Sequence, residues 1–189
     1  MTKDDIRKEI LQKRNSLSRE EITDKSRLIH DKVLKMDEYK NAENILIYAS
    51  MGSEVKTDDL INDALEKGKK VYCPKCTDTK NGVMEFIRIS HIIDLKKGYY
   101  GIREPEINDS SAIYIRKSGA LVLMPLVAFD ESRNRIGYKG GYYDRFLEKN
   151  PELLTVGLAF DIQKSGDIIP ADFYDIKPCM IVTENATFL

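Results

Sequence analysis

Residues 44–73 read NILIYASMGSEVKTDDLINDALEKGKKVYC, and this stretch decides the fold class. It begins with a short apolar run, residues 44–49, that is typical of a buried strand. Thr57 is a candidate N-cap for a helix with apolar residues at helical spacing, and Gly68 is its candidate terminator. Residues 70–73 are expected to form the next strand. A strand, a helix and a strand in succession predict a parallel sheet covered by helices.

Four segments further along the chain continue the strand pattern. Residues 84–89 alternate between apolar and polar side chains, as a half-buried strand does. Residues 119–124 and 155–159 are continuous apolar runs, which are typical of central strands in a parallel sheet. Residues 180–183 are expected to form the last strand.

The first forty residues have helical periodicity, with a break expected at Asn15 and Ser16. Ser18 and Glu21 fit a capping box that would open the second helix. We therefore expect an α/β protein: a single three-layer α/β/α domain over residues 1–189, with a mainly parallel open sheet and an N-terminal helical hairpin.

The composition is that of an ordinary globular domain, with 42% hydrophobic and 32% charged residues. A net charge of −1 excludes a global attraction to nucleic acid or acidic membranes. The longest apolar stretch, residues 120–129, is too short to span a bilayer. Three cysteines, an odd count, favour a reducing compartment. We expect a cytoplasmic monomer that binds small molecules and has no nucleic-acid or membrane partner.

The most informative segment is glycine-rich: residues 133–147 read RNRIGYKGGYYDRFL. It follows the strand near residues 120–128, where open α/β sheets bind ligands. Its glycines, its Arg and Lys side chains and a helix start near Gly141 together predict a phosphate site. It is not a Walker loop, because Gly140 follows Lys139 where that motif has Ser or Thr. A flexible charged turn is the alternative interpretation.

Three further features of the sequence are candidates for function. Asp144 and Asp175 are candidate Mg²⁺ ligands beside a phosphate, although the helix dipole alone also favours Asp144. Lys3, Arg7 and Arg14 fall at about 0°, 40° and 20° on a helical wheel and form a basic stripe, which is often only a solvated boundary. Glu54 follows the first strand; by itself it could be a plain surface acid.

Taken in order along nearly the whole chain, these motifs resemble the 5-formyltetrahydrofolate cyclo-ligase family. The segments that carry the resemblance are Lys3-x-x-x-Arg7, residues 48–54 (YASMGSE), 101–105 (GIREP), 125–130 (PLVAFD), 135–145 (RIGYKGGYYDR), Asp175 and 181–184 (IVTE). The Arg-x-Gly…Gly-Tyr-Tyr-Asp block is the most specific of them.

The resemblance implies ATP-dependent cyclisation of 5-formyltetrahydrofolate to 5,10-methenyltetrahydrofolate, with release of ADP and phosphate. The reaction would pass through a phosphorylated formyl group, an iminium phosphate. Such phosphoryl transfer depends on positioning and charge neutralisation, which suits a site of cations, glycine and carboxylates.

The resemblance also implies roles for individual residues. ATP as co-substrate would be bound by Lys3, Arg7, Arg135, Ile136, Gly137, Tyr138, Lys139, Gly140, Gly141, Tyr142 and Tyr143. The folate would contact Ala49, Glu54, Tyr138, Lys139, Gly140, Gly141 and Tyr142. Arg135, Lys139 and Arg145 are the candidate catalytic cations, and Asp144 and Asp175 would hold Mg²⁺. Two positions depart from the family pattern: Lys139 replaces a usual glycine, and Tyr174 stands where His or Asn is expected.

Other function classes remain open at this stage. A sugar-phosphate isomerase or CoA-transferase-like protein could use the glycine-rich segment for a substrate phosphate, and would act without ATP. A nucleotide- or RNA-binding module could use the basic stripe, but the net charge opposes it. Cys73 and Cys76 have CxxC spacing, yet without a second ligand pair they do not predict a zinc site.

Overall fold

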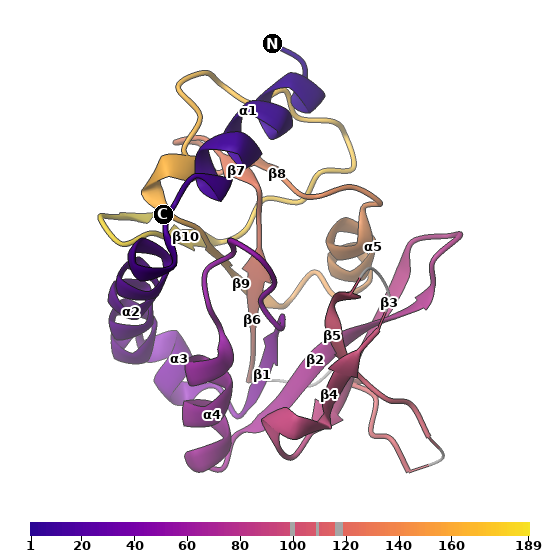
Figure 1. Ribbon diagram of the computed structural model, residues 1–189. Coiled ribbons are helices and arrows are strands. Elements are labelled where there is room, and N and C mark those ends of the chain that lie inside the picture. Colours follow the sequence, from indigo (N-terminus) through magenta and orange to yellow (C-terminus); the bar gives the residue numbers. More distant parts are fainter. Residues whose placement is uncertain (99–100, 109, 116–118) are drawn as a thin grey trace.

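The computed structural model describes residues 1–98, 101–108, 110–115 and 119–189. Its centre is a seven-stranded sheet in the order β11-β10-β9-β6-β1-β2-β3 (Figure 1). The strands are β1 (Asn44–Ile47), β2 (Lys70–Asp78), β3 (Val83–Ile89), β6 (Ala120–Pro125), β9 (Leu154–Leu158), β10 (Met180–Val182) and β11 (Thr187–Phe188). The five central strands run parallel, and the two edge strands, β11 and β3, are antiparallel. The mainly parallel sheet is therefore confirmed.

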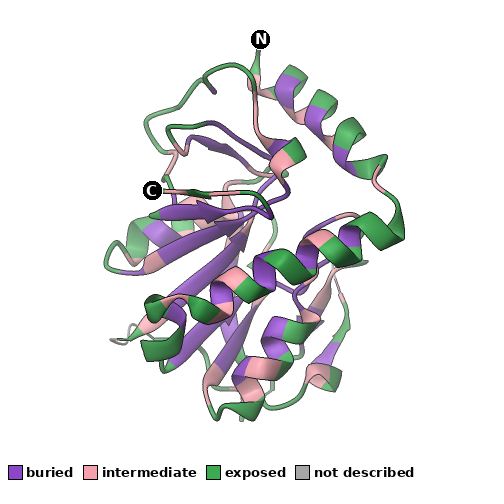
Figure 2. Ribbon diagram, turned by 90° about the vertical axis from the view of Figure 1, so that its left-hand side faces the viewer, coloured by how far each residue is buried: buried purple, intermediate pink, exposed green. Residues whose placement is uncertain are grey.

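Helices cover both faces of this sheet. On one face lie α2 (Arg19–Lys35), α3 (Asp37–Asn41) and α4 (Asp58–Glu66), with their buried residues turned inward (Figure 2). On the other face lies α5 (Tyr142–Lys149). The strand residues alternate between the two layers: Ile45 and Ile47 join the core under α2 and α4, and Leu46 joins the core under α5. The three-layer α/β/α expectation is met.

The N-terminal helices both begin with capping boxes. Thr2 and Asp5 cap α1 (Lys3–Asn15), and Ser18 and Glu21 cap α2 as the sequence predicts. The two helices pack on different partners. Helix α1 contacts the 3₁₀ helix η3 (Asp161–Gln163) and the short strand β7 (Ala128–Phe129), whereas α2 contacts α3 and β10. The expected pair is present, but it forms an open angle in place of a closely packed hairpin (Figure 1).

Strand β2 is longer than the sequence predicts because its second half pairs only with β3. The register with β1 stops at Tyr72, while the pairing with β3 continues to Asp78. Pro74 lies in this second half, where no β1 residue pairs with it, so its missing N–H costs no hydrogen bond to β1. CxxC spacing therefore reflects two positions along one strand, and Cys73 is buried while Cys76 is half-buried.

Smaller elements connect the main ones. Beside β2 is the hairpin of β4 (Leu95–Lys97) and β5 (Arg103–Pro105), which follows the 3₁₀ helix η1 (Ile92–Asp94). Strand β7 pairs with β8 (Arg135–Ile136) just beyond the carboxyl end of β6. Among the helices of the described ranges, none is long and apolar enough to cross a membrane.

Candidate active site

The candidate site lies beyond the carboxyl ends of β1 and β6, and four distant segments build it. They are helix α1, the loop that follows β1 (residues 48–57), the segment from β8 to the start of α5 (residues 135–145), and residues 172–176. Carboxyl ends of parallel strands are where open α/β sheets bind ligands.

The glycine-rich turn enters α5 through two left-handed residues, Gly140 (φ +84°) and Gly141 (φ +62°). Gly141 is the N-cap and supplies no side chain, so no capping side chain covers the first N–H groups of α5. Arg145 donates to Gly82 O (3.3 Å) and to Gly140 O. Its guanidinium therefore supports the turn, and the catalytic role expected for Arg145 stays a prediction.

Arg135 and Asp144 form the ion pair at the centre of this segment. Arg135 is 8% exposed. Its Nη2 lies 2.5 Å from Asp144 Oδ1, and its Nε donates to Ile176 O (3.0 Å). Asp144 Oδ1 also accepts from Ile176 N (3.0 Å). Burial lowers the pKa of Arg135, and the carboxylates of Asp144 and Asp175 oppose this. The pair thus ties α5 to residues 172–176 and brings both predicted metal ligands around one cation.

Lys3 reaches the same region from α1. Its Nζ lies 2.6 Å from Asp172 Oδ2 and also bonds Asp175. Although burial alone would raise it, hydrogen bonds from Lys3 and from Asp172 N hold the pKa of Asp175 below its usual value. The bonds from Lys3 and Asp172 N reach Oδ2 of Asp175, and those from Arg135 and Ile176 N reach Oδ1 of Asp144.

The predicted donor set for a metal ion consists of the Asp144 and Asp175 carboxylates. Within the ranges that the structure describes, no three His, Cys, Asp or Glu side chains gather as a metal cluster. Mg²⁺ is commonly held by one or two carboxylates together with substrate phosphates and water. Asp144 and Asp175 fit that kind of site, in which phosphate oxygens complete the coordination.

Arg7 and Lys139 lie where α1 crosses the glycine-rich turn. Arg7 Nε donates to Gly137 O (2.9 Å), and its guanidinium pairs with Asp4. Lys139 is exposed, with its Nζ 3.7 Å from Asp4 Oδ1. Arg7 therefore holds the turn in place, whereas Lys139 extends from the rim of the site.

Glu54 lies at the other end of the site and is 5% exposed. Its Oε2 accepts from Met51 N (2.7 Å), and the hydroxyl of Tyr138 donates to its carboxylate. Burial raises the pKa of Glu54, while the Met51 N–H and the charge of Arg14 oppose the shift. A carboxylate that is buried beside the cations Arg14 and Lys56 is a functional-site candidate, not a plain surface acid.

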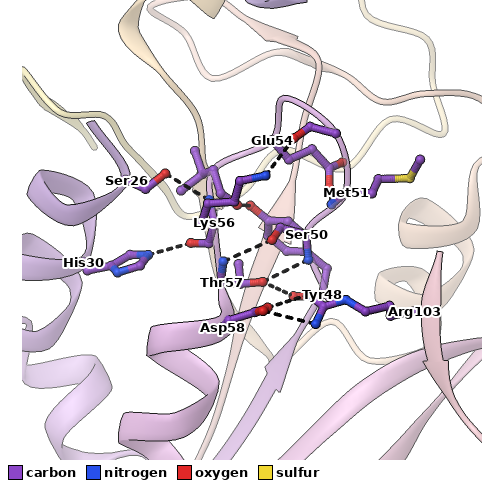
Figure 3. A network of polar contacts seen from close by, with 12 residues as sticks. Ser26, His30, Tyr48, Ser50, Met51, Glu54, Lys56, Thr57, Asp58 and Arg103 are labelled. Atoms are coloured by element: carbon purple, nitrogen blue, oxygen red, sulfur yellow. Dashed lines mark hydrogen bonds and ion pairs between the residues drawn. The ribbon is translucent and has the colours of Figure 1, made fainter. Parts of the chain in front are cut away.

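A network of polar contacts fixes the loop that carries Glu54 (Figure 3). The Thr57 hydroxyl donates to Tyr48 O (2.7 Å) and accepts from Ser50 N (3.0 Å). Ser26 and His30 of α2 bind the backbone of Lys56. Thr57 is the N-cap residue of α4, as the sequence predicts, but its hydroxyl is used within the loop and makes no capping hydrogen bond to the helix.

The network continues to the β4–β5 hairpin. Arg103, which belongs to the 101–105 motif, binds Asp58 in the first turn of α4, with Nη1 3.1 Å from Oδ2 (Figure 3). This contact links the hairpin to the helix that follows the Glu54 loop. The 101–105 motif therefore supports the start of α4 and does not itself contribute a residue to the candidate site.

The aromatic residues and Ala49 differ in how they can meet a ligand. The Tyr143 hydroxyl is buried and has no hydrogen-bond partner among the described residues, while its ring packs against Phe86. Such an unpaired buried hydroxyl is costly unless a ligand or water satisfies it. Tyr142 bonds the Cys76 thiol. The side chain of Ala49 is packed in the core, which leaves its backbone as the part able to contact a substrate.

Two residues in this region were given no binding or catalytic role from the sequence. Asp172 pairs with Lys3, and no motif marked it. Arg14 is 3% exposed; its Nε donates to Ser53 Oγ (3.0 Å) and its Nη2 donates to the Tyr138 hydroxyl. The basic stripe on α1 was the available signal for Arg14, and the structure shows that this stripe faces the protein.

Comparisons with known proteins all lead to one family. The sequence model of the 5-formyltetrahydrofolate cyclo-ligase family matches residues 1–184. A 5-formyltetrahydrofolate cyclo-ligase of Haemophilus influenzae is 31% identical over 90% of this chain and 91% of its own length. That of Mus musculus is 31% identical over 96% and 93%. The solution structure of Aquifex aeolicus 5,10-methenyltetrahydrofolate synthetase is 30% identical and superposes with a TM-score of 0.84, covering 99% of this chain and 92% of that one.

Proposed function

The chain belongs to the 5-formyltetrahydrofolate cyclo-ligase family, and we propose that it converts 5-formyltetrahydrofolate and ATP into 5,10-methenyltetrahydrofolate, ADP and phosphate. One observation supports this assignment above the others. The glycine-rich segment, residues 135–145, carries the Arg135–Asp144 ion pair, and Tyr138 of the same segment bonds the buried Glu54 of the β1 loop. A phosphate-binding half and a half suited to a heterocycle with N–H groups are therefore adjacent.

The proposed reaction joins these two halves. The formyl oxygen attacks the γ-phosphorus of ATP, and ADP leaves. The nitrogen at position 10 then attacks the activated carbon of the resulting iminium phosphate, loses its proton, and phosphate leaves as the ring closes. Charge builds on the ADP oxygen in the first step and on the departing phosphate in the last, so the protein contributes by holding the reactants and neutralising charge.

The cationic half of the site would bind the triphosphate. The triphosphate would contact the side chains of Lys3 and Arg7 and the backbone of the turn, residues 136–141. The first turn of α5 has no capping side chain, so its N–H groups are available to an anion. Arg135 is placed to approach the transferring phosphoryl group from the protein side, and Lys139 from the rim. Tyr142 and Tyr143 complete the ATP contacts, with the Tyr143 hydroxyl ready to donate or accept a bond.

Mg²⁺ bound by Asp144 and Asp175 would neutralise charge on the phosphate oxygens. In the structure these carboxylates are paired with Arg135 and Lys3. When a metal binds the two carboxylates, it would replace Arg135 and Lys3 as their counter-charge. These two cations would then be able to turn toward the ATP oxygens.

The folate half of the site centres on Glu54. Its buried carboxylate can accept hydrogen bonds from the N–H edge of the pterin ring, with Tyr138, the backbone of Ala49 and the glycines of the turn around it. A bidentate acceptor in a water-poor position orients a flat heterocycle more strictly than solvent-exposed groups do.

The direct test mixes the purified protein with 5-formyltetrahydrofolate and Mg-ATP and follows the near-ultraviolet absorbance of the methenyl product. We expect an absorbance rise that needs ATP and that EDTA abolishes. Glu54→Gln should lose most of the rise, whereas Lys13→Met, which removes a surface cation of α1, should retain it. No rise with bound ATP would contradict the folate assignment, and turnover of a sugar phosphate without ATP would favour the isomerase alternative.

We further propose that the protein acts as a cytoplasmic monomer without nucleic-acid partners. Light scattering after size exclusion tests the oligomeric state, and a mass near 21.7 kDa is the expected result. Fractionation of cells tests the compartment. Retention on a polyanion column at physiological salt would contradict the absence of a nucleic-acid partner.

A further inference from the structure

Helix α1 sends three cations into different parts of the site, and the proposed function uses only two of them. Lys3 binds Asp172 and Asp175, and Arg7 binds the backbone of Gly137. Arg14, two turns further along, points to the folate half. At 3% exposure it is nearly as buried as a core residue, which is unusual for an arginine and calls for a specific set of partners.

The partners of Arg14 come from two separate segments. Its Nε donates to Ser53 Oγ (3.0 Å), next to Glu54 in the β1 loop. Its Nη2 donates to the hydroxyl of Tyr138 in the glycine-rich segment, and its guanidinium carbon lies 5.4 Å from the centre of that ring. Ser53 in turn donates to Asn15 of α1. The end of α1 is thus bonded to both segments that meet at Glu54.

Tyr138 relays this contact to Glu54. A tyrosine hydroxyl has one proton to donate and lone pairs to accept with. It accepts from Arg14 and donates to Glu54, so its rotation is fixed at both ends. Burial, with the nearby Glu54 carboxylate, raises the pKa of Tyr138 to about 12, so the hydroxyl keeps its proton at neutral pH.

Arg14 also sets the charge around Glu54. The groups that face this carboxylate are Arg14 from α1, Tyr138, Lys56 and the buried Tyr48 and Tyr143. Burial raises the pKa values of the three tyrosines, which are therefore neutral. Of the two cations, Arg14 is the buried one, while Lys56 bonds Gly52 O (2.7 Å).

We propose that Arg14 is a positioning residue for folate binding: its guanidinium holds the Tyr138 hydroxyl on the Glu54 carboxylate and thereby aims that carboxylate at the N–H edge of the pterin. The inference rests on the proposed function, since it assigns the ligand of Glu54. It separates α1 into an ATP end, with Lys3 and Arg7, and a folate end, with Arg14.

The test measures KM for 5-formyltetrahydrofolate and for ATP in wild type, Arg14→Met, Arg14→Lys and the control Lys13→Met. Arg14→Met should raise the folate KM on the order of tenfold or more, because a bond to a charged group in a buried site is lost. The KM for ATP should stay within about twofold. Lys13→Met changes the charge of the same helix at an exposed ion pair with Glu9, so both KM values should be unchanged.

The pH profile distinguishes positioning from mere support of the fold. Burial raises the pKa of Glu54, and the charge of Arg14 opposes this rise. In Arg14→Met the pKa of Glu54 should therefore be higher, and the acid limb of kcat/KM for the folate should move to higher pH. Arg14→Lys keeps the charge and should return the limb toward its wild-type position. It should recover the KM only in part, since an ammonium cannot bond Ser53 and Tyr138 through one planar fork.

Several results would overturn the inference. Equal rises of both KM values in Arg14→Met, or an acid limb at the wild-type pH, would make Arg14 a structural residue only. If circular dichroism shows that Arg14→Met does not fold, Tyr138→Phe decides, because it deletes only the relaying hydroxyl; an unchanged folate KM there would refute the relay. Absence of ATP-dependent turnover by the wild type would instead overturn the proposed function, and this inference with it.

Discussion

Arg135 and Asp144 join two parts of the site through side chains that are 6% and 21% exposed. A buried ion pair stabilises a fold little compared with an apolar pair of the same volume, but loss of one partner leaves an uncompensated charge. The same pair touches the backbone of Ile176 twice, so it also fixes residues 172–176. Stability and the proposed metal binding would therefore depend on the same carboxylate, that of Asp144.

Asp144→Asn separates these two contributions. We expect the free energy of unfolding to fall by about 3 kcal/mol, because the buried guanidinium of Arg135 loses its counter-charge. Metal-dependent turnover should fall at least about 100-fold. Urea unfolding at pH 7 and the absorbance assay measure the two effects. The double variant Arg135→Met/Asp144→Asn should regain part of the stability but none of the turnover; if it is no more stable than the single variant, the ion-pair argument fails.

The residues of the glycine-rich segment could be predicted because their chemistry is local. Glycine, cation and carboxylate stand within a few positions of one another, and Arg135, Asp144 and the turn keep that proximity in the fold. Arg14 could not be separated from an ordinary surface arginine in the same way. On the helical wheel it lies beside Lys3, and what buries it, Ser53 and Tyr138, comes from segments 39 and 124 positions away.

Helix α1 is attached to the domain more lightly than α2. Its buried Ile6 and Ile10 join a small cluster with Val127, Ile136 and Ile169, apart from the main core. Helix α2 places Ile29 and Val33 in that core, both fully buried. The rest of the attachment of α1 is polar, through Lys3, Arg7 and Arg14, and each of these contacts leads to the proposed ligand site.

Hydrogen exchange should reveal this difference. We expect the amides of α1 to exchange faster than those of α2 in the free protein, because fewer apolar contacts must break for α1 to open. Mg-ATP should slow the exchange of α1 much more than that of α2, since Lys3 and Arg7 would gain phosphate partners. Mass spectrometry of peptic fragments from the two helices measures both. Equal protection of the two helices with and without the nucleotide would show that α1 is an ordinary structural helix.

The glycine-rich turn is a second element, and the proposed function depends on its shape. Gly140 has φ +84°, and a Cβ at this position would lie 2.7 Å from Cε2 of Tyr142. Gly140→Ala therefore strains the backbone by about 1 kcal/mol and displaces the Tyr142 ring. We expect a small loss of thermal stability but a loss of turnover of at least about tenfold, with most of it in the KM for ATP.

Gly166→Ala is the matched control for this change. Gly166 lacks a positive φ, and its added Cβ would meet no atom within 4 Å. We expect wild-type turnover from this variant. If Gly140→Ala also turns over at the wild-type rate, the turn does not approach the phosphates through its backbone.

Across the whole molecule, the sheet could be predicted and the assembly of the site could not. Continuous apolar runs identify central parallel strands because both faces of such strands are buried, and residues 120–125 and 154–158 follow this rule. The pair β7–β8 and the final strand β11 are two residues long, too short for a periodic signal. The open angle between α1 and α2 likewise depends on tertiary partners and not on the capping boxes that begin the two helices.

Because the site joins four segments that are far apart in the sequence, its ligands should stabilise the whole fold. A ligand at 100 times its Kd that binds only the folded state adds about 2.7 kcal/mol, which corresponds to roughly 5–10 °C in Tm for a chain of this size. We expect Mg-ATP to give a shift of this order in differential scanning fluorimetry. EDTA should remove most of this Tm shift. Without Mg²⁺ between them, the carboxylates of Asp144 and Asp175 repel the phosphates of ATP. An equal shift in Tm with ATP and EDTA would show that these two residues hold no metal. Their carboxylates would then serve only as ion-pair partners of Arg135 and Lys3.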